Sequence, residues 1–173
     1  ATIKAVDVSG NSSLGEDSSN KDTSTSSSKV SIDSISTDTG SSDSDFITKD
    51  KSLSVHGRVT KPLAADEHIE VSNDGVNWTL ATYDNSTQQW SLVDSDKHNN
   101  SFDYHVRIVD SAGNVGNTDQ QSITIDTSAP GLVTLDKIND NVGRVKGDIP
   151  NNGSSDDNRP TFIGTAEANS IVT

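Results

Sequence analysis

The sequence predicts an all-β fold, a sandwich of two packed sheets, and three observations lead to that prediction. Apolar and polar residues alternate along successive short segments, which is the period of a strand with one buried face. The pair Asp74-Gly75 stands between two such segments and is a strong signal for a β-hairpin turn. No segment shows the apolar spacing of a helix, so we expect strands and turns throughout.

Each expected strand rests on its own alternation. About seven segments within about ninety residues show the pattern, which is the count and spacing of an immunoglobulin-like Greek-key sandwich. They lie at residues 46–48, 53–58, 68–71, 78–82, 89–93, 104–108 and 122–126. The residues expected to face the core are Leu53, Val55, Gly57, Ile69, Val71, Trp78, Trp90, Leu92, Tyr104, Val106 and Ile108.

Internal repetition indicates tandem units, because only 29% of the 173 residues are apolar and one core is unlikely to span them all. Three pairs of segments match: residues 3–11 with 106–114, 30–34 with 123–127, and 48–57 with 155–164. We therefore expect a complete domain over residues 35–128, the C-terminal end of a preceding repeat over 1–34, and the N-terminal part of a following repeat over 129–173. Residues 14–28, rich in Ser, Asp and Thr, should form a mobile loop.

The composition excludes several classes of function. With 26 acidic against 13 basic residues the net charge is −13, which argues against nucleic acid and anionic lipid as partners. Cysteine is absent, so disulfides, thiol nucleophiles and Cys-ligated zinc are excluded. No apolar run approaches the roughly 20 residues of a spanning helix, so we expect no direct membrane insertion. Without a starting Met or a signal peptide, we expect a piece of a longer polypeptide whose export signal lies elsewhere.

The sequence gives no support for an enzyme. It contains no Gly-rich phosphate loop and no Gly-x-Ser-x-Gly elbow, although its many carboxylates could furnish a glycosidase pair. The histidines also lack the i, i+4 spacing of a zinc-binding helix. They are His56, His68, His98 and His105.

An acidic run from Asp33 to Asp50 is the strongest candidate for a binding site. It contains closely spaced carboxylates, hydroxyls and a glycine between two segments that are expected to be strands. Ca²⁺ takes about six to eight oxygen ligands, and carboxylates this dense repel one another unless they are neutralised. We therefore interpret the run as a linker between domains that Ca²⁺ stiffens. For any single residue, the alternative is that Asp and Asn simply form turns.

Two sets of ligands are expected, one for each joint between repeats. In the expected topology the loop between the last two strands approaches the linker before the first strand. At the first joint the candidates are Asp38, Gly40, Asp43, Asp45, Asp50, Asp110 and Asn114. At the second joint they are Asp126, Asp136, Asp140, Asp148, Asp156 and Asp157.

Several motifs together resemble a known family. They are Asp38-Thr39-Gly40, Asp45-Phe46-Ile47-Thr48-Lys49-Asp50, Val71-Ser72-Asn73-Asp74-Gly75 before Trp78, Val109-Asp110-Ser111-Ala112-Gly113-Asn114 and Ile125-Asp126-Thr127-Ser128-Ala129-Pro130. Their order resembles the bacterial Ig-like tandem repeats of giant non-fimbrial adhesins, which are biofilm-associated or RTX-type proteins exported by type 1 secretion. Two features depart from that pattern: the insertion at 14–28 and Lys49, where the next repeat has Asp156.

The resemblance implies a rod of sandwiches on the bacterial cell surface, with Ca²⁺ at the junctions. The partners would be neighbouring repeats of the same chain, and other parts of the full protein would contact a host cell or a biofilm matrix. The alternative function is direct recognition of a glycan or of a neighbouring copy, for which Trp78 and Trp90 could supply a stacking platform. Both fall on inward strand positions, which favours core packing and hence the spacer function.

Overall fold

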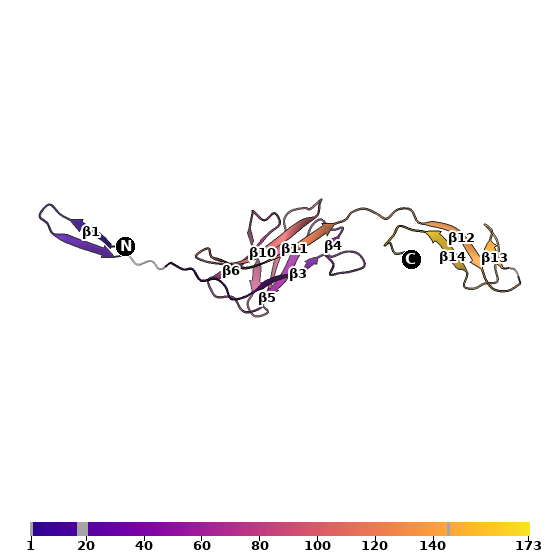
Figure 1. Cartoon of the computed structure of the whole chain (residues 1–173), viewed down its shortest axis with the longest axis horizontal. Helices are drawn as coiled ribbons and strands as arrows, with labels where there is room; N and C mark the ends of the chain where they lie inside the picture. Colours follow the sequence, from indigo (N-terminus) through magenta and orange to yellow (C-terminus); the bar gives the residue numbers. More distant parts are fainter. Residues whose placement is uncertain (1, 17–20, 145) are drawn as a thin grey trace. The chain divides into compact units, whose positions relative to one another are not determined.

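The computed structural model describes residues 2–16, 21–144 and 146–173, and within these ranges it contains strands, turns and loops but no helix (Figure 1). The chain divides into two compact units, Ala1–Thr127 and Ser128–Thr173. Among the described residues there is accordingly no helix that could span a membrane. The all-β fold class is therefore confirmed.

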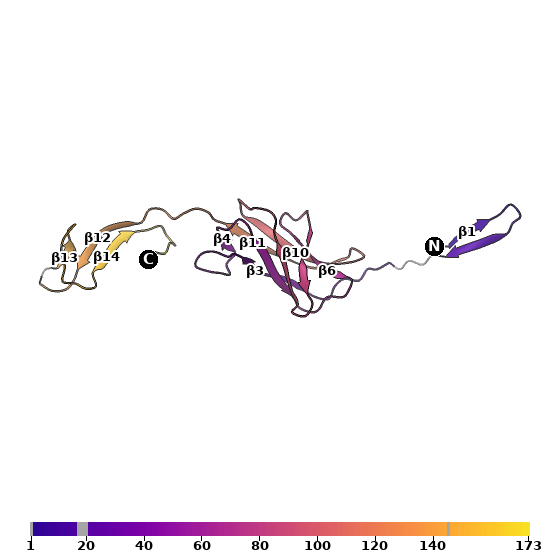
Figure 2. The same cartoon turned by 180° about the vertical axis from the view of Figure 1, so that it is seen from behind.

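The larger unit contains a β-sandwich, whose two sheets Figures 1 and 2 show from opposite sides. In spatial order, one sheet consists of β4 (Ile47–Thr48), β11 (Val115–Ile125), β10 (Phe102–Asp110), β6 (Glu67–Ser72) and β7 (Thr79–Leu80). The other consists of β3 (Val30–Ser36), β5 (Ser54–Val59), β9 (Gln89–Val93) and β8 (Thr82–Asp84). Neighbouring strands are antiparallel except β4 and β11, which pair in parallel. This is the immunoglobulin-like sandwich that the strand pattern predicts.

The core lies between the sheets, where the apolar face of each strand is buried. Tyr104, Val106 and Ile108 point inward from β10 and are fully buried, as predicted. Trp90 on β9 is only 2% exposed, and its Nε1 donates a hydrogen bond to the backbone oxygen of Ser31 at 3.2 Å. The indole occupies the space that a side chain on Gly57 would need, so a glycine is required opposite this tryptophan.

The segment 78–82, expected to form one strand, divides between the two sheets. β7 pairs with β6 and β8 pairs with β9, and Ala81 at the crossing donates its N–H to the Ile69 carbonyl at 2.9 Å. Trp78 lies in the loop before β7, where strand alternation no longer applies. It is half-buried on the outer face of the sheet, with the Arg107 guanidinium carbon 3.8 Å from its ring centroid. The core position predicted for Trp78 is therefore wrong.

The predicted domain boundary after residue 34 is also wrong. β3 is not the last strand of a preceding repeat, because it pairs with β5 from Val30↔Val59 to Ser36↔Ser54. Its residues Val30, Ile32 and Ile35 are buried in the same core as Trp90. The error has a physical cause: alternation identifies which face of a strand is buried, but it does not identify the strand's partner.

The chain before the sandwich begins with a hairpin of β1 (Thr2–Val6) and β2 (Ser12–Glu16), whose described residues are exposed. The expected mobile loop at 14–28 thus overlaps β2, and its residues 17–20 lie outside the described ranges. The following residues contact the sandwich. Asn114 Nδ2 donates to the Asp22 carbonyl at 3.3 Å, and the buried Ser28 donates its hydroxyl to the Lys61 carbonyl at 3.0 Å.

The smaller unit contains β12 (Thr134–Asp140), β13 (Gly147–Ile149) and β14 (Thr161–Thr165) in the order β13-β12-β14. The β12–β14 pairing repeats the β3–β5 pairing. Leu135 lies opposite Gly164 as Ile32 lies opposite Gly57, and both pairs of strands have an irregularity in register directly after these positions.

Candidate functional site

The acidic segment expected to link two domains lies inside one domain. Residues 37–46 connect β3 to β4, and β4 pairs with the last residues of β11, Ile47 opposite Thr124. The N–H of Asp126 then donates to the Thr48 carbonyl at 2.9 Å. The loop therefore lies where the chain leaves the sandwich, and we call residues 37–50 together with Asp126 the exit end.

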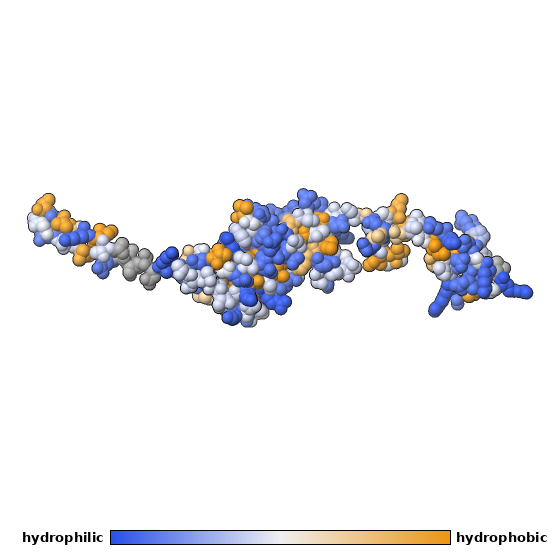
Figure 3. Space-filling model, viewed as in Figure 1, coloured by the Kyte–Doolittle hydropathy of each residue, from blue (hydrophilic) through white to orange (hydrophobic). Residues whose placement is uncertain are grey.

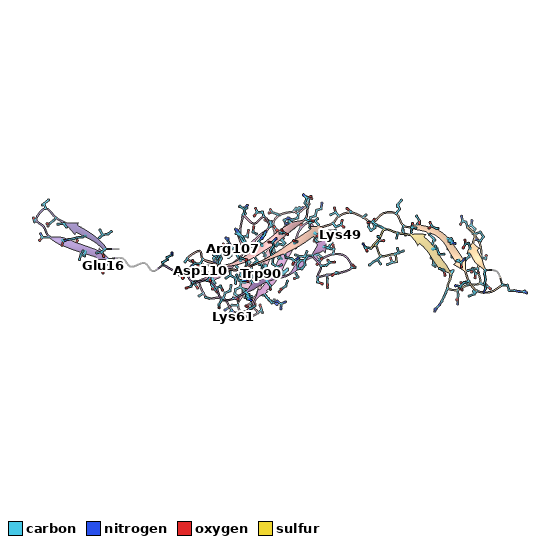
Figure 4. The ribbon with its side chains drawn as sticks, in the orientation of Figure 1. Glu16, Lys49, Lys61, Trp90, Arg107 and Asp110 are labelled. Carbon is cyan, nitrogen blue, oxygen red and sulfur yellow. The ribbon has the colours of Figure 1, made fainter. Side chains whose placement is uncertain are left out.

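Asp110 and Asn114 lie at the opposite end of the sandwich, in the turn from β10 to β11. Figure 4 shows Asp110 and Lys49 at the two ends of this domain. β10 is 9 residues long, so at about 3.3 Å per residue the turn is roughly 25–30 Å from the exit end. Because Ca²⁺ lies about 2.3–2.6 Å from its ligands, these two residues cannot complete a site with Asp38. The expected convergence is wrong.

The carboxylate of Asp110 is instead occupied by its own turn. Oδ1 accepts from the N–H groups of Ala112 at 2.9 Å and Asn114 at 2.8 Å, and Oδ2 accepts from Asn114 Nδ2 at 2.8 Å. The hydrogen bond from the Asn114 side chain is the main reason why the pKa of Asp110 lies below its ordinary value. Gly113 completes the turn with a φ of 86°.

The turn after β1 has the same construction. Asp7 Oδ1 accepts from the N–H groups of Ser9 and Asn11 at 2.9 Å, and Asn11 Nδ2 donates to Asp7 Oδ2 at 2.9 Å. Gly10 has a φ of 87°. Because one hydrogen-bond pattern recurs at both copies of Asp-x-x-Gly-Asn, the motif is a self-contained turn, and turn formation accounts for Asp110 and Asn114.

Within the exit end, Asp38 has an incomplete set of hydrogen bonds. Its Oδ2 accepts from the Phe46 N–H at 2.9 Å, while its Oδ1 is buried and has no hydrogen-bond partner among the described residues. A buried acceptor without a partner costs about 1–3 kcal/mol. The loop holds this oxygen in place, because Thr48 Oγ1 donates to the Thr37 carbonyl at 2.7 Å and Thr39 Oγ1 accepts from the Lys49 N–H at 2.8 Å.

The other exit-end candidates lie in this loop or shortly after β4. Asp45 Oδ1 accepts from the Ile47 N–H at 3.1 Å, and Asp50 Oδ1 accepts from the Ser52 N–H at 3.0 Å. Asp43 is exposed in the same loop, and Gly40 has a φ of 122° there. Across the described parts of the chain, no three His, Cys, Asp or Glu side chains converge. Among these carboxylates, Asp38 is the one with a buried oxygen that lacks a hydrogen-bond partner in the described residues, so it is the best-placed candidate ligand.

The candidates in the smaller unit fall into two groups. Asp140 is the last residue of β12, and the loop after it meets the loop that carries Asp156 and Asp157. Asp140 Oδ2 accepts from the Ser155 hydroxyl at 2.7 Å, and Asp157 Oδ2 accepts from the Asn141 N–H at 3.3 Å. The Asp156 carboxylate lies against Gly143 in this group. Asp136 and Asp148 lie apart from these loops, on β12 and β13.

The carboxylate of Asp148 on β13 is hydrogen-bonded to side chains of the neighbouring strand β12. Its Oδ1 accepts from Asn139 Nδ2 at 3.0 Å, and its Oδ2 accepts from Lys137 Nζ at 3.3 Å. The bond from Asn139, followed by the one from Lys137, lowers the pKa of Asp148. Both oxygens of Asp148 therefore already have partners, as do those of Asp140, whose Oδ1 accepts from the Val142 N–H at 3.0 Å.

A polar cluster in the sandwich is not among the sites that the sequence predicts. Asp94 Oδ2 accepts from the Tyr104 hydroxyl at 2.7 Å and from His98 Nε2 at 2.8 Å, while Asn73 Nδ2 donates to the same oxygen at 3.1 Å. Burial raises the pKa of Asp94, but hydrogen bonds from the Asp96 N–H, Tyr104, His98 and Asn73 outweigh it and lower the pKa overall. Burial, followed by the bond to Asp94, raises the pKa of Tyr104. The signal in the sequence is a tyrosine on an inward strand position, since its hydroxyl needs a buried partner.

Comparison with known protein families agrees with this architecture. A family model described as a bacterial Ig-like domain matches residues 23–127, which include all strands from β3 to β11. The match starts before β3, as the pairing of that strand requires. A search of curated proteins finds no match to the chain.

Proposed function

The chain belongs to the bacterial Ig-like domain family, and from this premise we propose that it is a spacer segment of a large bacterial surface adhesin. Its sandwich holds neighbouring modules apart, and Ca²⁺ at the exit end stiffens the connection to the module that follows. Domains of this family are common in extracellular and surface proteins, which supports the location. Cell adhesion or biofilm formation would then depend on other parts of the full protein.

The buried Oδ1 of Asp38 is the observation on which the proposal depends. It is a charged acceptor in an ordered loop, without a partner in the described residues, at the end where the chain leaves the domain. A divalent cation there would neutralise the carboxylate of Asp38 and give its buried Oδ1 a partner. Because three carboxylates do not converge within the described residues, further ligands would come from the adjoining module. When the ligands of one ion come from two modules, ion binding favours one relative orientation of these modules.

The repeated pairing supports the tandem arrangement. β12 and β14 reproduce the register of β3 and β5, including the position of the irregularity, as the opening strands of a second sandwich would. The repeated Asp-x-x-Gly-Asn turn after β1 likewise matches the end of β10. A rod of such modules would have one exit end, and one cation position, per junction.

Calcium titration followed by thermal unfolding and small-angle scattering tests this function. Ca²⁺ should raise the melting temperature and reduce the spread of inter-unit distances relative to the chain in chelator. Asp66→Asn removes a carboxylate from an exposed turn outside the exit end and should leave both responses intact. Identical profiles with calcium and with chelator would rule out the spacer mechanism.

A second function, recognition of a glycan, is supported by the position of Trp78. Its indole lies on the outer face of the sheet beside Arg107, and the Arg107 guanidinium also pairs with Glu70 at 2.7 Å. A partly exposed aromatic ring with fixed polar neighbours is suited to stack on a sugar. Loss of binding to a glycan array in Trp78→Ala, with the fold retained, would favour recognition over the spacer function.

A further inference from the structure

A pulling force along the chain enters the sandwich through one sheet and leaves it through the other. The chain reaches this domain at β3, which belongs to the four-stranded sheet, and departs from β11, which belongs to the five-stranded sheet. Strands precede the domain (β1 and β2) and follow it (β12, β13 and β14), so a force on these flanking strands acts on the sandwich through β3 and β11. The force must therefore pass between the two sheets.

β3 and β11 are neighbours in different sheets, and they run in the same direction. Asn117 Oδ1 on β11 accepts from the Val30 N–H on β3 at 2.8 Å, and two residues further along both strands Asp119 Oδ2 accepts from the Ile32 N–H at 2.9 Å. β4, which follows β3 in the chain, pairs in parallel with the end of β11. A force that pulls the start of β3 and the end of β11 apart therefore shears both side-chain bonds at the same time.

The other contacts between the two sheets are of a different kind. The apolar core lies between them, while the face of the sandwich visible in Figure 3 is mainly hydrophilic. Apolar packing is not directional, whereas a hydrogen bond weakens steeply when its geometry is distorted. The hydrogen bond from Tyr104 to Asp94 joins β10 to the loop after β9, but it does not involve β3 or β11. Sliding of β3 against β11 must therefore break the two side-chain bonds and the short β4–β11 ladder at its outset.

The donors of these two bonds belong to buried residues. Val30 is 5% exposed and Ile32 is 8% exposed, so water cannot readily replace an acceptor that moves away. A buried N–H group without a partner is costly, and the charged acceptor of Asp119 makes a stronger hydrogen bond than a neutral one. Both features raise the barrier to separating β3 from β11.

We propose that the sandwich bears tensile load along the chain, and that Asn117 and Asp119 form a clamp that holds its first and last long strands, β3 and β11, against this load. The clamp consists of the two side-chain bonds to the N–H groups of Val30 and Ile32. The inference rests on the proposed function in one respect, because a spacer between a cell and another surface is under tension when the two are pulled apart. Calcium plays no part in the clamp.

Single-molecule pulling of the full chain tests the clamp, because forced unfolding is governed by the unfolding rate and not by equilibrium stability. The chain has no cysteine, so Lys21→Cys and Ala129→Cys would place the two attachment points on either side of the sandwich. At constant force in chelator, Asp119→Ala should shorten the lifetime of the folded sandwich about tenfold, because a buried N–H loses a charged acceptor. Asp119→Asn keeps a neutral acceptor and should shorten it less, as should Asn117→Ala, which removes a neutral one.

Two controls separate load bearing from ordinary stability. Val71 is buried on β6, which carries neither end of the domain, so Val71→Ala should lower the free energy of unfolding in urea. Its lifetime under load should change by less than about twofold, since its contacts are still intact when the clamp breaks. The second control changes the pulling axis: attachment at Lys61→Cys and Lys97→Cys loads the β5–β9 pair within one sheet. Along that axis, Asp119→Ala should leave the lifetime unchanged.

The outcomes separate this inference from the proposed function. An unchanged lifetime of Asp119→Ala, an equal shortening by Val71→Ala, or an equal effect of Asp119→Ala along both pulling axes would each overturn the inference. If Asp119→Ala does not fold, Asp119→Asn and Asn117→Ala decide the question by the same three comparisons. A working clamp without any calcium effect on stability would leave the inference standing and remove the calcium-stiffened spacer. A calcium effect without a clamp would remove the inference and leave the spacer standing.

Discussion

Asp119 on β11 accepts a hydrogen bond from the backbone N–H of Ile32 on β3, with its Oδ2 at 2.9 Å. Two residues earlier, Asn117 Oδ1 accepts from the Val30 N–H at 2.8 Å. β3 is the outer strand of its sheet, so these side chains satisfy N–H groups that another chain could otherwise pair with. The two sheets are thereby joined along one edge without a continuous strand ladder.

We expect Asp119→Ala to destabilise the sandwich by about 1–3 kcal/mol, because the N–H of the buried Ile32 loses its partner. Urea unfolding measures the loss, and hydrogen exchange should show faster exchange at the Ile32 amide. Asp119→Asn keeps an acceptor and should lose less. Equal stability of the Ala variant and the wild type would show that this hydrogen bond does not contribute to the free energy of unfolding.

The two tryptophans should respond differently to truncation. Trp90→Ala removes a side chain that is 2% exposed and leaves a cavity against Gly57, so we expect a loss of about 3–5 kcal/mol. Trp78→Ala removes a half-buried ring from the outer face and should cost about 1 kcal/mol or less, mainly through its contact with Arg107. Chemical denaturation of both variants checks the difference, which would vanish if Trp78 were part of the core.

Asp94 should make the sandwich sensitive to acid. Its pKa is lowered in the fold, so its contribution to stability is complete above the ordinary carboxyl pKa of about 4 and is lost as the pH falls through the folded value. Protonation of Asp94 would weaken the hydrogen bonds that it accepts from His98 and Asn73. Below about pH 4, wild-type stability should therefore fall more steeply than that of Asp94→Asn.

The Asn variant should be less stable than the wild type at neutral pH by about 1–3 kcal/mol, because its amide cannot accept all of these bonds. This difference in the free energy of unfolding should become smaller on acidification, and urea titrations between pH 2 and pH 7 would measure it. A difference in the free energy of unfolding that stays constant with pH would mean that other carboxylates control acid unfolding.

Alternation along the sequence was sufficient to predict which side chains of most strands face the core. Tyr104, Val106 and Ile108 are examples, since each lies within a strand long enough for the period of two to hold. Alternation gave the wrong face for Trp78, which precedes a strand of only 2 residues. It could not identify the partner of Val30–Ser36, because that partner is set by long-range pairing. Local pattern therefore predicts faces better than partners.

The candidate metal site shows the same limit more sharply. The composition of the acidic run pointed to Asp38, Asp45 and Asp50, and the structure places all three at the exit end, with Asp38 and Asp45 in the loop before β4 and Asp50 after β4. Nothing local to Asp110 reveals that a strand of 9 residues separates it from that loop. The carboxylate of Asp110 and the loop could be assigned to opposite ends only from the topology of the pairing.

Asp38 and Asp110 give the clearest test of the calcium proposal, because the structure predicts opposite consequences for the same substitution. For sites of extracellular type, with dissociation constants of about 0.1–1 mM, Ca²⁺ at about 10 mM should stabilise the wild type by about 1.4–2.7 kcal/mol. Asp38→Asn retains an oxygen for the Phe46 N–H but loses the charge of the buried Oδ1. It should leave the melting temperature in chelator almost unchanged and abolish the calcium response.

Asp110→Asn should do the reverse. Its amide nitrogen cannot accept the bond from Asn114, so the turn weakens and the melting temperature falls in calcium and in chelator alike. The increment that calcium adds should remain as in the wild type, since the turn lies at the other end of β10. Differential scanning calorimetry of both variants, with and without calcium, measures all four values. If Asp110→Asn loses the calcium increment while Asp38→Asn keeps it, the exit end is not where the ion binds.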